Sequence, residues 1–353
     1  MVSIRDMLQM VVDQQGSDLH LIAGSPPTLR IHGELTPIPD QAALLEQDME
    51  ALITPLLSPE QKELFNVNKE LDFSFQFEQY GRFRINAYHQ KGIQAASLRL
   101  IPSKIKSIEE LGLPQICHQF ASVRQGLVLV TGPTGQGKSS TLAAIIEEVN
   151  QTRGAHIVTI EDPIEFVYTP AKSLISQREI HSDTHSWDIA LRSVVREDPD
   201  VVLVGEMRDY ETIAAALTVA ETGHLVFATL HTNSAAQTID RIIDVFPAEQ
   251  QAQIRSQLAL TIEGVFSQRL LPSLRGGRVA AAEVLIATSA VRNLIREGKS
   301  YQIDNVIQTS SDVGMTTLNT HLGQLLSQEL ISEDVATEYG YKPEGTARSL
   351  SGR

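Results

Sequence analysis

Residues 126–141 read GLVLVTGPTGQGKSST, and this stretch decides the fold of the larger part of the chain. It begins as an apolar run, continues as a glycine-rich loop and ends where apolar residues with helical spacing start. An apolar run without alternation is typical of a strand that is buried on both faces of a sheet. The stretch therefore predicts a strand, a tight loop and a helix, in that order.

The loop in this stretch fits the pattern G-x-x-x-x-G-K-[ST], in which backbone N–H groups surround a phosphate. Glycines let successive N–H groups point at one anion, the lysine reaches the outer phosphates, and the next hydroxyl is offered to Mg²⁺. The motif therefore predicts a site for ATP and Mg²⁺, with Ser139 as a ligand of the metal ion. The residues that would form it are Gly132, Thr134, Gly135, Gly137, Lys138, Ser139 and Ser140.

Three further apolar runs follow this loop and read HIVTIED, DVVLVGE and HLVFATLH. Like the first run they lack alternation, and stretches with helical spacing separate them. From about residue 115 onward we therefore predict an α/β fold with a mostly parallel sheet flanked by helices. Beyond residue 245 the strand signals weaken, and we predict that helices dominate.

Carboxylates stand at the ends of two of these runs. Glu206 ends DVVLVGE, where a phosphate-loop ATPase needs an acid to hold Mg²⁺, directly or through water. Glu161 and Glu165 follow HIVTI, and the carboxyl ends of strands line the ligand crevice of an open parallel sheet. A carboxylate there can orient the attacking water. The alternative is an acidic turn interrupted by Pro163.

Two histidines, His224 and His231, flank the run LVFATL. His231 lies at the far end of the predicted strand, where its ring can contact the γ-phosphate. The alternative is that both rings serve the structure alone.

Five arginines are candidates for the positive charge that phosphoryl transfer requires in its transition state. They are Arg82, Arg84, Arg99, Arg196 and Arg208. When such an arginine comes from a neighbouring subunit, hydrolysis becomes conditional on assembly. For Arg82 and Arg84 the alternative is cross-strand pairing with polar residues of the preceding strand.

The first hundred residues follow a different pattern. Apolar and polar residues alternate over 71–78 and again over 82–87, which predicts an antiparallel hairpin with one wet face. Ser3 and Ser58 are predicted to cap helices, and residues 40–57 are predicted to be helical. We expect an α+β domain over residues 1–100, a linker over 101–114, an ATPase domain over 115–342 and a disordered tail over 343–353.

Charge and cysteine content exclude several classes of protein. The net charge of −14 repels nucleic acids and anionic lipids, so we expect no nucleic-acid partner. Cys117 is the single cysteine, which excludes an internal disulfide and a cysteine-rich zinc site and fits a reducing cytoplasm. The N-terminal residues lack a signal-peptide pattern, and no apolar run reaches the roughly 18 residues of a membrane helix. We therefore expect no direct insertion into a membrane.

Together these motifs resemble the type II/IV secretion ATPase superfamily, and most closely its pilus retraction branch of twitching motility proteins. GSDLHLIAGSPPTLRIHGEL is similar to the N-terminal signature, GPTGQGKSS to the Walker A loop and IEDPIEFV to the aspartate box. VVLVGEMRD resembles the Walker B strand and ETGHLVFATLHTNSA the histidine box. AVRNLIREGK resembles the C-terminal signature of retraction ATPases, so the resemblance covers nearly the whole chain.

The resemblance implies a PAS-like N-terminal domain and a RecA-like P-loop domain with a helical C-terminal extension. It implies a homo-hexameric ring with nucleotide between the two domains and arginines of an adjacent N-terminal domain at the site. Glu206 would help to hold Mg²⁺ and the lytic water, and Glu165 would polarise that water with support from Glu161. His231 would read the γ-phosphate, with His224 nearby.

The resemblance also implies a cytoplasmic motor that lies peripherally at the inner membrane and hydrolyses ATP to retract a type IV pilus. Its partners would be the inner-membrane pilus platform protein and an accessory retraction ATPase. Gln136 and Ser140 depart from the serine and threonine that retraction ATPases commonly show in the loop. Because Ser139 is kept, we expect activity to survive.

Four alternatives remain. One is the accessory retraction ATPase that works beside the principal one, from which the sequence separates this chain only weakly. A secretion or pilus-extension ring ATPase usually carries a four-cysteine zinc motif, which one cysteine cannot build. A nucleotide-binding scaffold without turnover is disfavoured by the intact Lys138, Ser139 and Glu206. A RecA-like DNA motor is disfavoured by the acidic balance of the chain.

Overall fold

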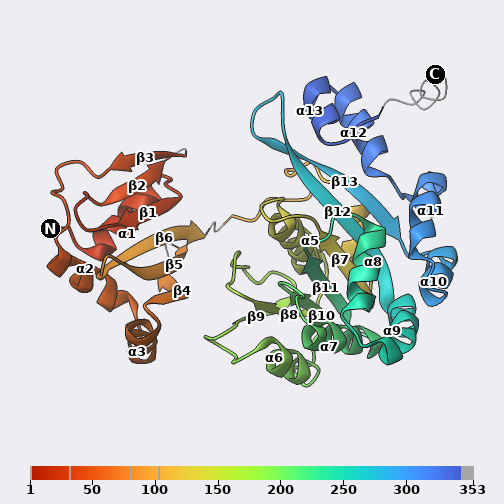
Figure 1. Ribbon diagram of the computed structural model, residues 1–353, viewed down its shortest axis with the longest axis horizontal. Helices are drawn as coiled ribbons and strands as arrows, with labels where there is room; N and C mark the ends of the chain where they lie inside the picture. The colour runs from red at the N-terminus through yellow and green to blue at the C-terminus, as the bar shows by residue number, and fades with distance from the viewer. Residues whose placement is uncertain (1, 32, 79–80, 102–103, 343–353) are drawn as a thin grey trace. The chain divides into compact units, whose positions relative to one another are not determined.

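The computed structural model describes residues 2–31, 33–78, 81–101 and 104–342, which form two compact units (Figure 1). The first unit comprises Met1–Lys104 and Pro163–Val167, and the second comprises Ile105–Asp162 and Tyr168–Arg353. The predicted tail over 343–353 and part of the predicted linker over 101–114 lie outside the described residues. Among the helices of the described ranges, none is long and apolar enough to cross a membrane.

The first unit is built on an antiparallel sheet with the strand order β3-β2-β1-β6-β5-β4. Its strands are β1 Asp18–Leu21, β2 Thr28–Ile31, β3 Glu34–Pro37, β4 Glu70–Phe77, β5 Gly81–Gln90 and β6 Ile93–Ile101. Its helices are α1 Ile4–Asp13, α2 Glu46–Ile53, η1 Thr54–Leu56 and α3 Pro59–Asn68. The predicted hairpin is confirmed as β4 and β5, which pair along their whole length.

Capping side chains set the starts of these helices. The Ser3 hydroxyl accepts from the N–H of Asp6 at the start of α1, and the Ser58 hydroxyl accepts from the N–H of Gln61 at the start of α3. Both predicted caps are confirmed. The predicted helix over residues 40–57 is wrong at its start, because α2 begins at Glu46, where Asp48 accepts from the N–H of Leu45.

The two faces of the first sheet differ in polarity. One face packs against the helices and contributes fully buried side chains such as Leu19, Leu98 and Ile85. On the alternate positions the strand register places Asp18 opposite Arg99 and Arg99 opposite Arg84. Directly opposed residues point to the same side of a sheet, so the other face carries a row of charged groups.

The second unit contains a sheet with the strand order β13-β12-β7-β11-β10-β8-β9, which is parallel except for β13 (Figure 1). The apolar runs of the sequence form β7 Gly126–Thr131, β8 His156–Glu161, β10 Val201–Val204 and β11 Leu225–Leu230. Every residue of β7, β10 and β11 is buried, as expected for strands with both faces covered. The prediction of a mostly parallel sheet is confirmed.

The prediction that helices dominate beyond residue 245 is confirmed, but it missed one pair of strands. β12 Ile262–Pro272 and β13 Arg278–Ile286 form an antiparallel hairpin that widens the sheet beyond β7. Its strand signal is weak because alanines fill β13 and buried polar residues interrupt β12, and alanine has a low strand propensity. β9 Leu174–Glu179, at the opposite edge, was not predicted either.

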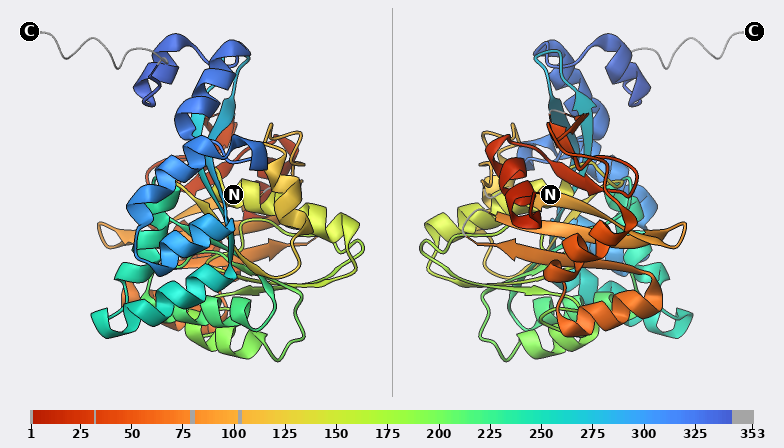
Figure 2. Two further views of the ribbon diagram at one scale, coloured as in Figure 1. Left: turned by 90° about the vertical axis from the view of Figure 1, so that its right-hand side faces the viewer. Right: turned by 90° about the vertical axis from the view of Figure 1, so that its left-hand side faces the viewer.

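Helices cover both faces of this sheet (Figures 1 and 2). One face packs its buried side chains against α6 Trp187–Val194, α7 Tyr210–Glu221, α8 Ala235–Asp244, α9 Ala248–Thr261 and α10 Ser289–Arg296. α5 Lys138–Thr152 packs against β7 and against α4 Ile116–Ser122. α4 also carries Cys117, where burial raises the pKa of the thiol to about 12.

The C-terminal helices pack beside the β12–β13 hairpin. They are η2 Ser300–Gln302, α11 Ile303–Thr309, η3 Ser311–Val313, α12 Leu318–Ser327 and α13 Glu333–Glu338. α12 and α13 share a small apolar core with Leu271 and Ala281 of the hairpin. The hairpin therefore joins the central sheet to the last helices of the described chain.

Candidate functional site

The phosphate loop connects β7 to α5 and is held close to β12. Gly132 has φ 145°, and a Cβ at this position would lie 2.5 Å from the carbonyl oxygen of Gln268. Gly137 has φ 79°, and a Cβ there would lie 3.0 Å from a methyl group of Leu270. Both positions combine a left-handed backbone with a close neighbour, so a side chain at either would displace the loop.

The amino end of α5 is shaped for an anion. Its first turn contains Lys138, Ser139 and Ser140, and no side chain of the described residues caps it at Gly137. The first N–H groups of a helix lack acceptors within the helix, and the helix dipole adds a positive field there. A phosphate group fits this end of the helix.

Lys138 adds a positive charge over the loop. Its side chain is buried, and Nζ donates to the carbonyl oxygens of Gly132 at 2.9 Å and Pro133 at 3.1 Å. These carbonyls hold the ammonium group above the loop amides. The predicted role of Lys138 as the contact to the outer phosphates agrees with this placement.

Glu206 follows β10 and lies among cationic groups. Its Oε1 is 2.8 Å from Nε of Arg208 and 3.0 Å from Nε2 of His231. Burial acts to raise the pKa of Glu206, but the hydrogen bond from Arg208 and the charges of His231 and Lys138 outweigh it. The pKa therefore lies below its ordinary value, and the side chain is a carboxylate at neutral pH.

His231 joins this carboxylate to the phosphate loop. Its Nδ1 lies 3.3 Å from Oγ1 of Thr134, and its Nε2 faces Glu206. The residue follows the carboxyl end of β11, which lies between β7 and β10 in the sheet. Thr134, His231 and Glu206 thus meet at the carboxyl edge of three neighbouring parallel strands, where open α/β sheets bind ligands.

The structure separates His224 from these residues. His224 precedes the amino end of β11, and its Nδ1 lies 3.0 Å from both Thr222 Oγ1 and the carbonyl oxygen of Val219. Because a strand rises about 3.3 Å per residue, roughly 20 Å lies between the two ends of this run. This corrects the expectation that His224 is near His231: its ring holds the turn between α7 and β11.

Two more carboxylates were predicted to lie at this edge. Glu161 is the last residue of β8 and is buried, with Oε1 accepting from the Thr159 hydroxyl at 2.7 Å and from the Gln177 amide at 3.4 Å. Glu165 is exposed and lies in Pro163–Val167, which belongs to the first unit. The role of either residue toward water stays a prediction.

The predicted arginines of the second unit differ in their surroundings. Arg208 pairs with Glu206 although its own side chain is 77% exposed, and the hydrogen bond to Glu206 raises the pKa of Arg208. Arg196 is exposed on the turn that follows α6. Arg208 is therefore near enough to the candidate site to lower the pKa of its carboxylate.

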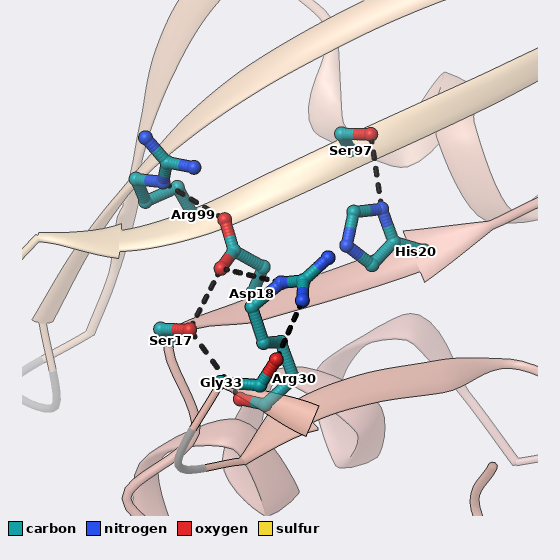
Figure 3. Close-up of polar contacts among 7 residues, drawn as sticks. All are labelled: Ser17, Asp18, His20, Arg30, Gly33, Ser97 and Arg99. Atoms are coloured by element: carbon teal, nitrogen blue, oxygen red, sulfur yellow. Dashed lines mark hydrogen bonds and ion pairs between the residues drawn. The ribbon is translucent and has the colours of Figure 1, made fainter. Parts of the chain in front are cut away.

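The predicted arginines of the first unit lie on its polar sheet face. Asp18 lies between Arg99 and Arg30 (Figure 3), with Oδ1 2.8 Å from Nε of Arg99 and Oδ2 3.7 Å from Nε of Arg30. Burial acts to raise the pKa of Asp18, but hydrogen bonds from Ser17 and Arg99 outweigh it and lower the pKa. Asp18 holds Arg99 by Nε, while 70% of the arginine side chain stays exposed.

Arg82 and Arg84 pair with the neighbouring strand. Nη2 of Arg84 lies 3.6 Å from Oδ2 of Asp72, and Nη2 of Arg82 donates to the hydroxyl of Ser74. The predicted cross-strand pairing is confirmed for both arginines. A contact of these two arginines with the nucleotide of a neighbouring subunit stays a prediction.

Mg²⁺ fits the donors at the edge of the second sheet. Ser139 in the first turn of α5 and the Glu206 carboxylate are hard oxygen ligands of the kind that Mg²⁺ prefers. In the described part of the chain, no group of three or more His, Cys, Asp or Glu side chains could hold a metal ion by itself.

Residues of β12 were missed by the sequence reasoning because the strand itself was missed. Gln268 donates to the backbone of Gln136 in the phosphate loop, and Nη2 of Arg269 lies 2.9 Å from Oδ1 of Asn233, just after His231. The signal that could have found the hairpin is the pair Gly276-Gly277 between two apolar runs.

Comparisons with known proteins agree with this geometry. The model of a family described as type II/IV secretion system protein matches residues 4–276. The chain is 50% identical over 343 residues to the type IV pilus retractation ATPase PilT of Pseudomonas aeruginosa, covering 97% of this chain and 99% of that one. It is 49% identical over 337 residues to the twitching motility protein of Neisseria gonorrhoeae, covering 95% of this chain and 89% of that one.

A solved structure gives the same picture. The crystal structure of the pilus retraction motor PilT with bound ADP superposes with a TM-score of 0.90 at 45% sequence identity. The match covers 97% of this chain and 98% of that chain. The mixed α/β fold of the present chain is therefore the fold of that solved protein.

Proposed function

We propose, from the premise that this chain belongs to the family of type II/IV secretion system proteins, that it is an ATPase that powers the retraction of type IV pili. The observation that carries the proposal is the contact chain from the phosphate loop through His231 to the Glu206 carboxylate. Through these contacts the Glu206 carboxylate lies close to the phosphate loop, on the side where the γ-phosphate of a bound nucleotide would lie.

The phosphate loop binds the nucleotide. The N–H groups of the loop and of the first turn of α5 donate to the phosphates, and Lys138 neutralises their outer charge. Ser139 and Glu206 would hold Mg²⁺, which would supply charge neutralisation at the phosphate oxygens. His231 contacts the γ-phosphate from the loop that follows β11.

Carboxylates orient the lytic water. Glu165 is the proposed water-polarising residue, with Glu161 in support and Glu206 helping to hold the water beside the metal ion. The depressed pKa of Glu206 supports this role, because a carboxylate at neutral pH accepts hydrogen bonds and ligates a cation.

The active form is a homo-hexameric ring. Each subunit consists of a PAS-like first domain and a RecA-like ATPase domain, and arginines of a neighbouring first domain complete the site. The exposed guanidinium of Arg99, anchored by Asp18, supports this role for Arg99, with Arg82 and Arg84 on the adjacent strand. An arginine supplied in this way raises phosphoryl transfer by about 10³–10⁵-fold.

The ring works in the cytoplasm, peripherally at the inner membrane, where it engages the pilus platform protein. An accessory retraction ATPase is a second partner. What supports this placement is the similarity over almost the full chain to a protein named for pilus retraction.

Steady-state phosphate release from Mg-ATP by the purified full-length chain tests the proposal. We expect turnover by the native chain and a loss of about 100-fold or more in Lys138→Ala, because the charge on the transferred phosphate loses its partner. Lys172→Ala removes an exposed lysine and serves as the matched control, with unchanged turnover expected. Absence of phosphate release from the native oligomer would contradict the proposal.

A further inference from the structure

Gln136 occupies a position that the phosphate-loop pattern leaves open to any residue. In this chain it makes two hydrogen bonds to β12. Its side-chain Oε1 accepts from the N–H of Leu270 at 2.7 Å, and its backbone oxygen accepts from Nε2 of Gln268. One loop residue is thus attached to the sheet by both its backbone and its side chain.

The Leu270 N–H lies past the end of the pairing between β12 and β7, and Gln136 provides its acceptor. The pairing of β12 with β7 ends at Ser267 opposite Thr131, because β7 ends there and the chain turns into the loop. Past this point the β12 groups that face β7 have no strand beside them. The Gln136 side chain supplies the carbonyl that a longer β7 would have supplied, so it continues the ladder through Leu270.

Gln268 holds the loop from the buried side. Only 1% of this residue is exposed, and its amide is used at both ends: Oε1 accepts from the Thr141 hydroxyl at 2.7 Å, and Nε2 donates to the Gln136 backbone. A buried amide with both ends bonded fixes the relative position of the groups it joins. Here it joins β12, the loop and the first turns of α5.

The neighbouring Arg269 extends this contact to the other side of the site. Its Nη2 bonds Asn233, which lies two residues after His231. Gln268, Arg269 and Leu270 are consecutive, so one short segment of β12 holds both the phosphate loop and the loop that carries His231.

We propose that Gln136 is a positioning residue that docks the phosphate loop on Gln268–Leu270 of β12 and so presets the loop for a magnesium-bound adenine nucleotide. The inference rests on the proposed function for the identity of the ligand. Ordering a backbone segment costs conformational entropy, and a loop already held before binding loses less of it. The effect of Gln136 therefore falls on nucleotide affinity, because its bonds run to β12 and not to the reacting phosphate.

Binding of MgADP to the full-length chain, measured by calorimetry, tests the affinity. Gln136→Met keeps the length of the side chain and removes the acceptor, and it should weaken MgADP binding by about 5-fold, the equivalent of one lost hydrogen bond. Gln136→Ser is too short to reach Leu270 and should behave in the same way. Gln253→Met alters an exposed glutamine on α9 and should leave binding unchanged.

Hydrogen exchange in the nucleotide-free chain tests the docking directly. The Leu270 amide should be protected in the native chain and in Gln136→Glu, which keeps an acceptor, and should exchange faster in Gln136→Met. Protection of the β11 amides should be equal in all of these, which separates local undocking from general loss of structure.

A split of the kinetic constants completes the test. In Gln136→Met the KM for ATP should rise with the affinity loss, whereas kcat should change by less than about 2-fold.

The outcomes are distinguishable. Failure of the native chain to bind MgADP would overturn the proposed function. Tight binding by the native chain, with equal affinity and equal Leu270 protection in Gln136→Met and Gln136→Ser, would overturn the present inference and leave the proposed function standing.

Discussion

The two units display their charged side chains in opposite ways. In the second unit Lys138, Glu206 and His231 gather at one edge of a parallel sheet, beyond the ends of the strands. In the first unit Asp18 and Arg99 lie opposite each other on neighbouring antiparallel strands, on one face of the sheet. A cluster at the edge of a parallel sheet forms from residues that follow its strands. A row of charges on a sheet face depends instead on the register between the strands.

The carboxylates of the two regions differ in what surrounds them. Asp18 is 5% exposed and serves as an anchor for Arg99 and for the Ser17 hydroxyl. The side chain of Glu206 is 21% exposed and faces Arg208 and His231 at the candidate site. Within one subunit Asp18 should therefore contribute to stability, whereas Glu206 should contribute to the rate of hydrolysis.

Glu206→Gln is the sharpest test of this contrast. We expect kcat to fall by about 10²–10³-fold, because the neutral amide cannot hold Mg²⁺ and the lytic water as a carboxylate does. The urea midpoint should stay near that of the native chain. Single-turnover phosphate release together with urea unfolding measures both, and Glu211→Gln, at an exposed acid on α7, is the control. A normal kcat in Glu206→Gln would contradict the role of Glu206 in hydrolysis.

Asp18→Asn should lower the stability of the chain. We expect the free energy of unfolding to fall by about 1–2 kcal/mol, because a charge-assisted hydrogen bond is lost while Arg99 regains some hydration. MgADP binding to a single subunit should be unchanged. The pKa of Asp18 lies below its ordinary value of 3.8, so its contribution is fully present above about that pH and is lost as pH falls through the folded pKa. Urea unfolding at pH 7 therefore measures the full effect, and an unchanged midpoint would contradict the anchor role.

His321 gives a pH-dependent prediction in the second unit. Burial lowers the pKa of this histidine, and its Nδ1 accepts from the N–H of Ala282 at 2.9 Å. The depressed pKa means that its stability contribution is present above the unfolded value of about 6.5 and declines as pH falls toward the folded pKa. We expect up to about 1 kcal/mol of loss between pH 7.5 and 5.5.

His321→Asn supplies the control for this dependence. Asparagine keeps an acceptor for Ala282 and does not titrate in this range. Urea midpoints of the variant should therefore vary less with pH than those of the native chain over pH 5.5–7.5. If the urea midpoints of the two proteins changed equally with pH, His321 would not be the source of the pH dependence.

Asp72→Asn should have the smallest effect. Asp72 is 54% exposed and lies 3.6 Å from Arg84 on the same sheet face as Asp18. Exposed ion pairs contribute about 0.2–1 kcal/mol, and the long distance favours the low end of that range. A urea midpoint that falls as far as in Asp18→Asn would show that burial does not distinguish the two carboxylates.

Much of the candidate site could be predicted because its residues stand in short, ordered motifs. Lys138 and Ser139 belong to one consecutive loop, and Glu206 and His231 each follow an apolar run. The carboxyl ends of parallel strands meet at one edge of the sheet, so residues that follow these strands lie near one another there. The same runs predicted the central strands, since residues buried on both faces leave an unbroken apolar signal.

The hairpin and its contacts could not be predicted in this way. Gln268 and Ser267 are buried polar residues whose partners, Thr141 and Thr131, lie more than a hundred residues away in the sequence. Buried polar side chains reduce the apolar signal of a strand, and only the tertiary structure shows that they are satisfied.

Asp18 and His224 show the same limit in two other ways. The role of Asp18 depends on the register that sets it opposite Arg99, which no local pattern encodes. His224 and His231 belong to the same sequence motif, but the extended strand β11 lies between them and places them at opposite ends of the strand.

The β12–β13 hairpin also has a mechanical consequence. Near Gln268 it touches the phosphate loop, and farther along, at Leu271 and Ala281, it carries the small core of α12 and α13. From Gln268 to Leu271 the strand rises by about 10 Å, so a tilt of about 10° at Gln268 would move Leu271 by about 2 Å. A shift of the phosphate loop would therefore pass through β12 to the core that holds α12 and α13.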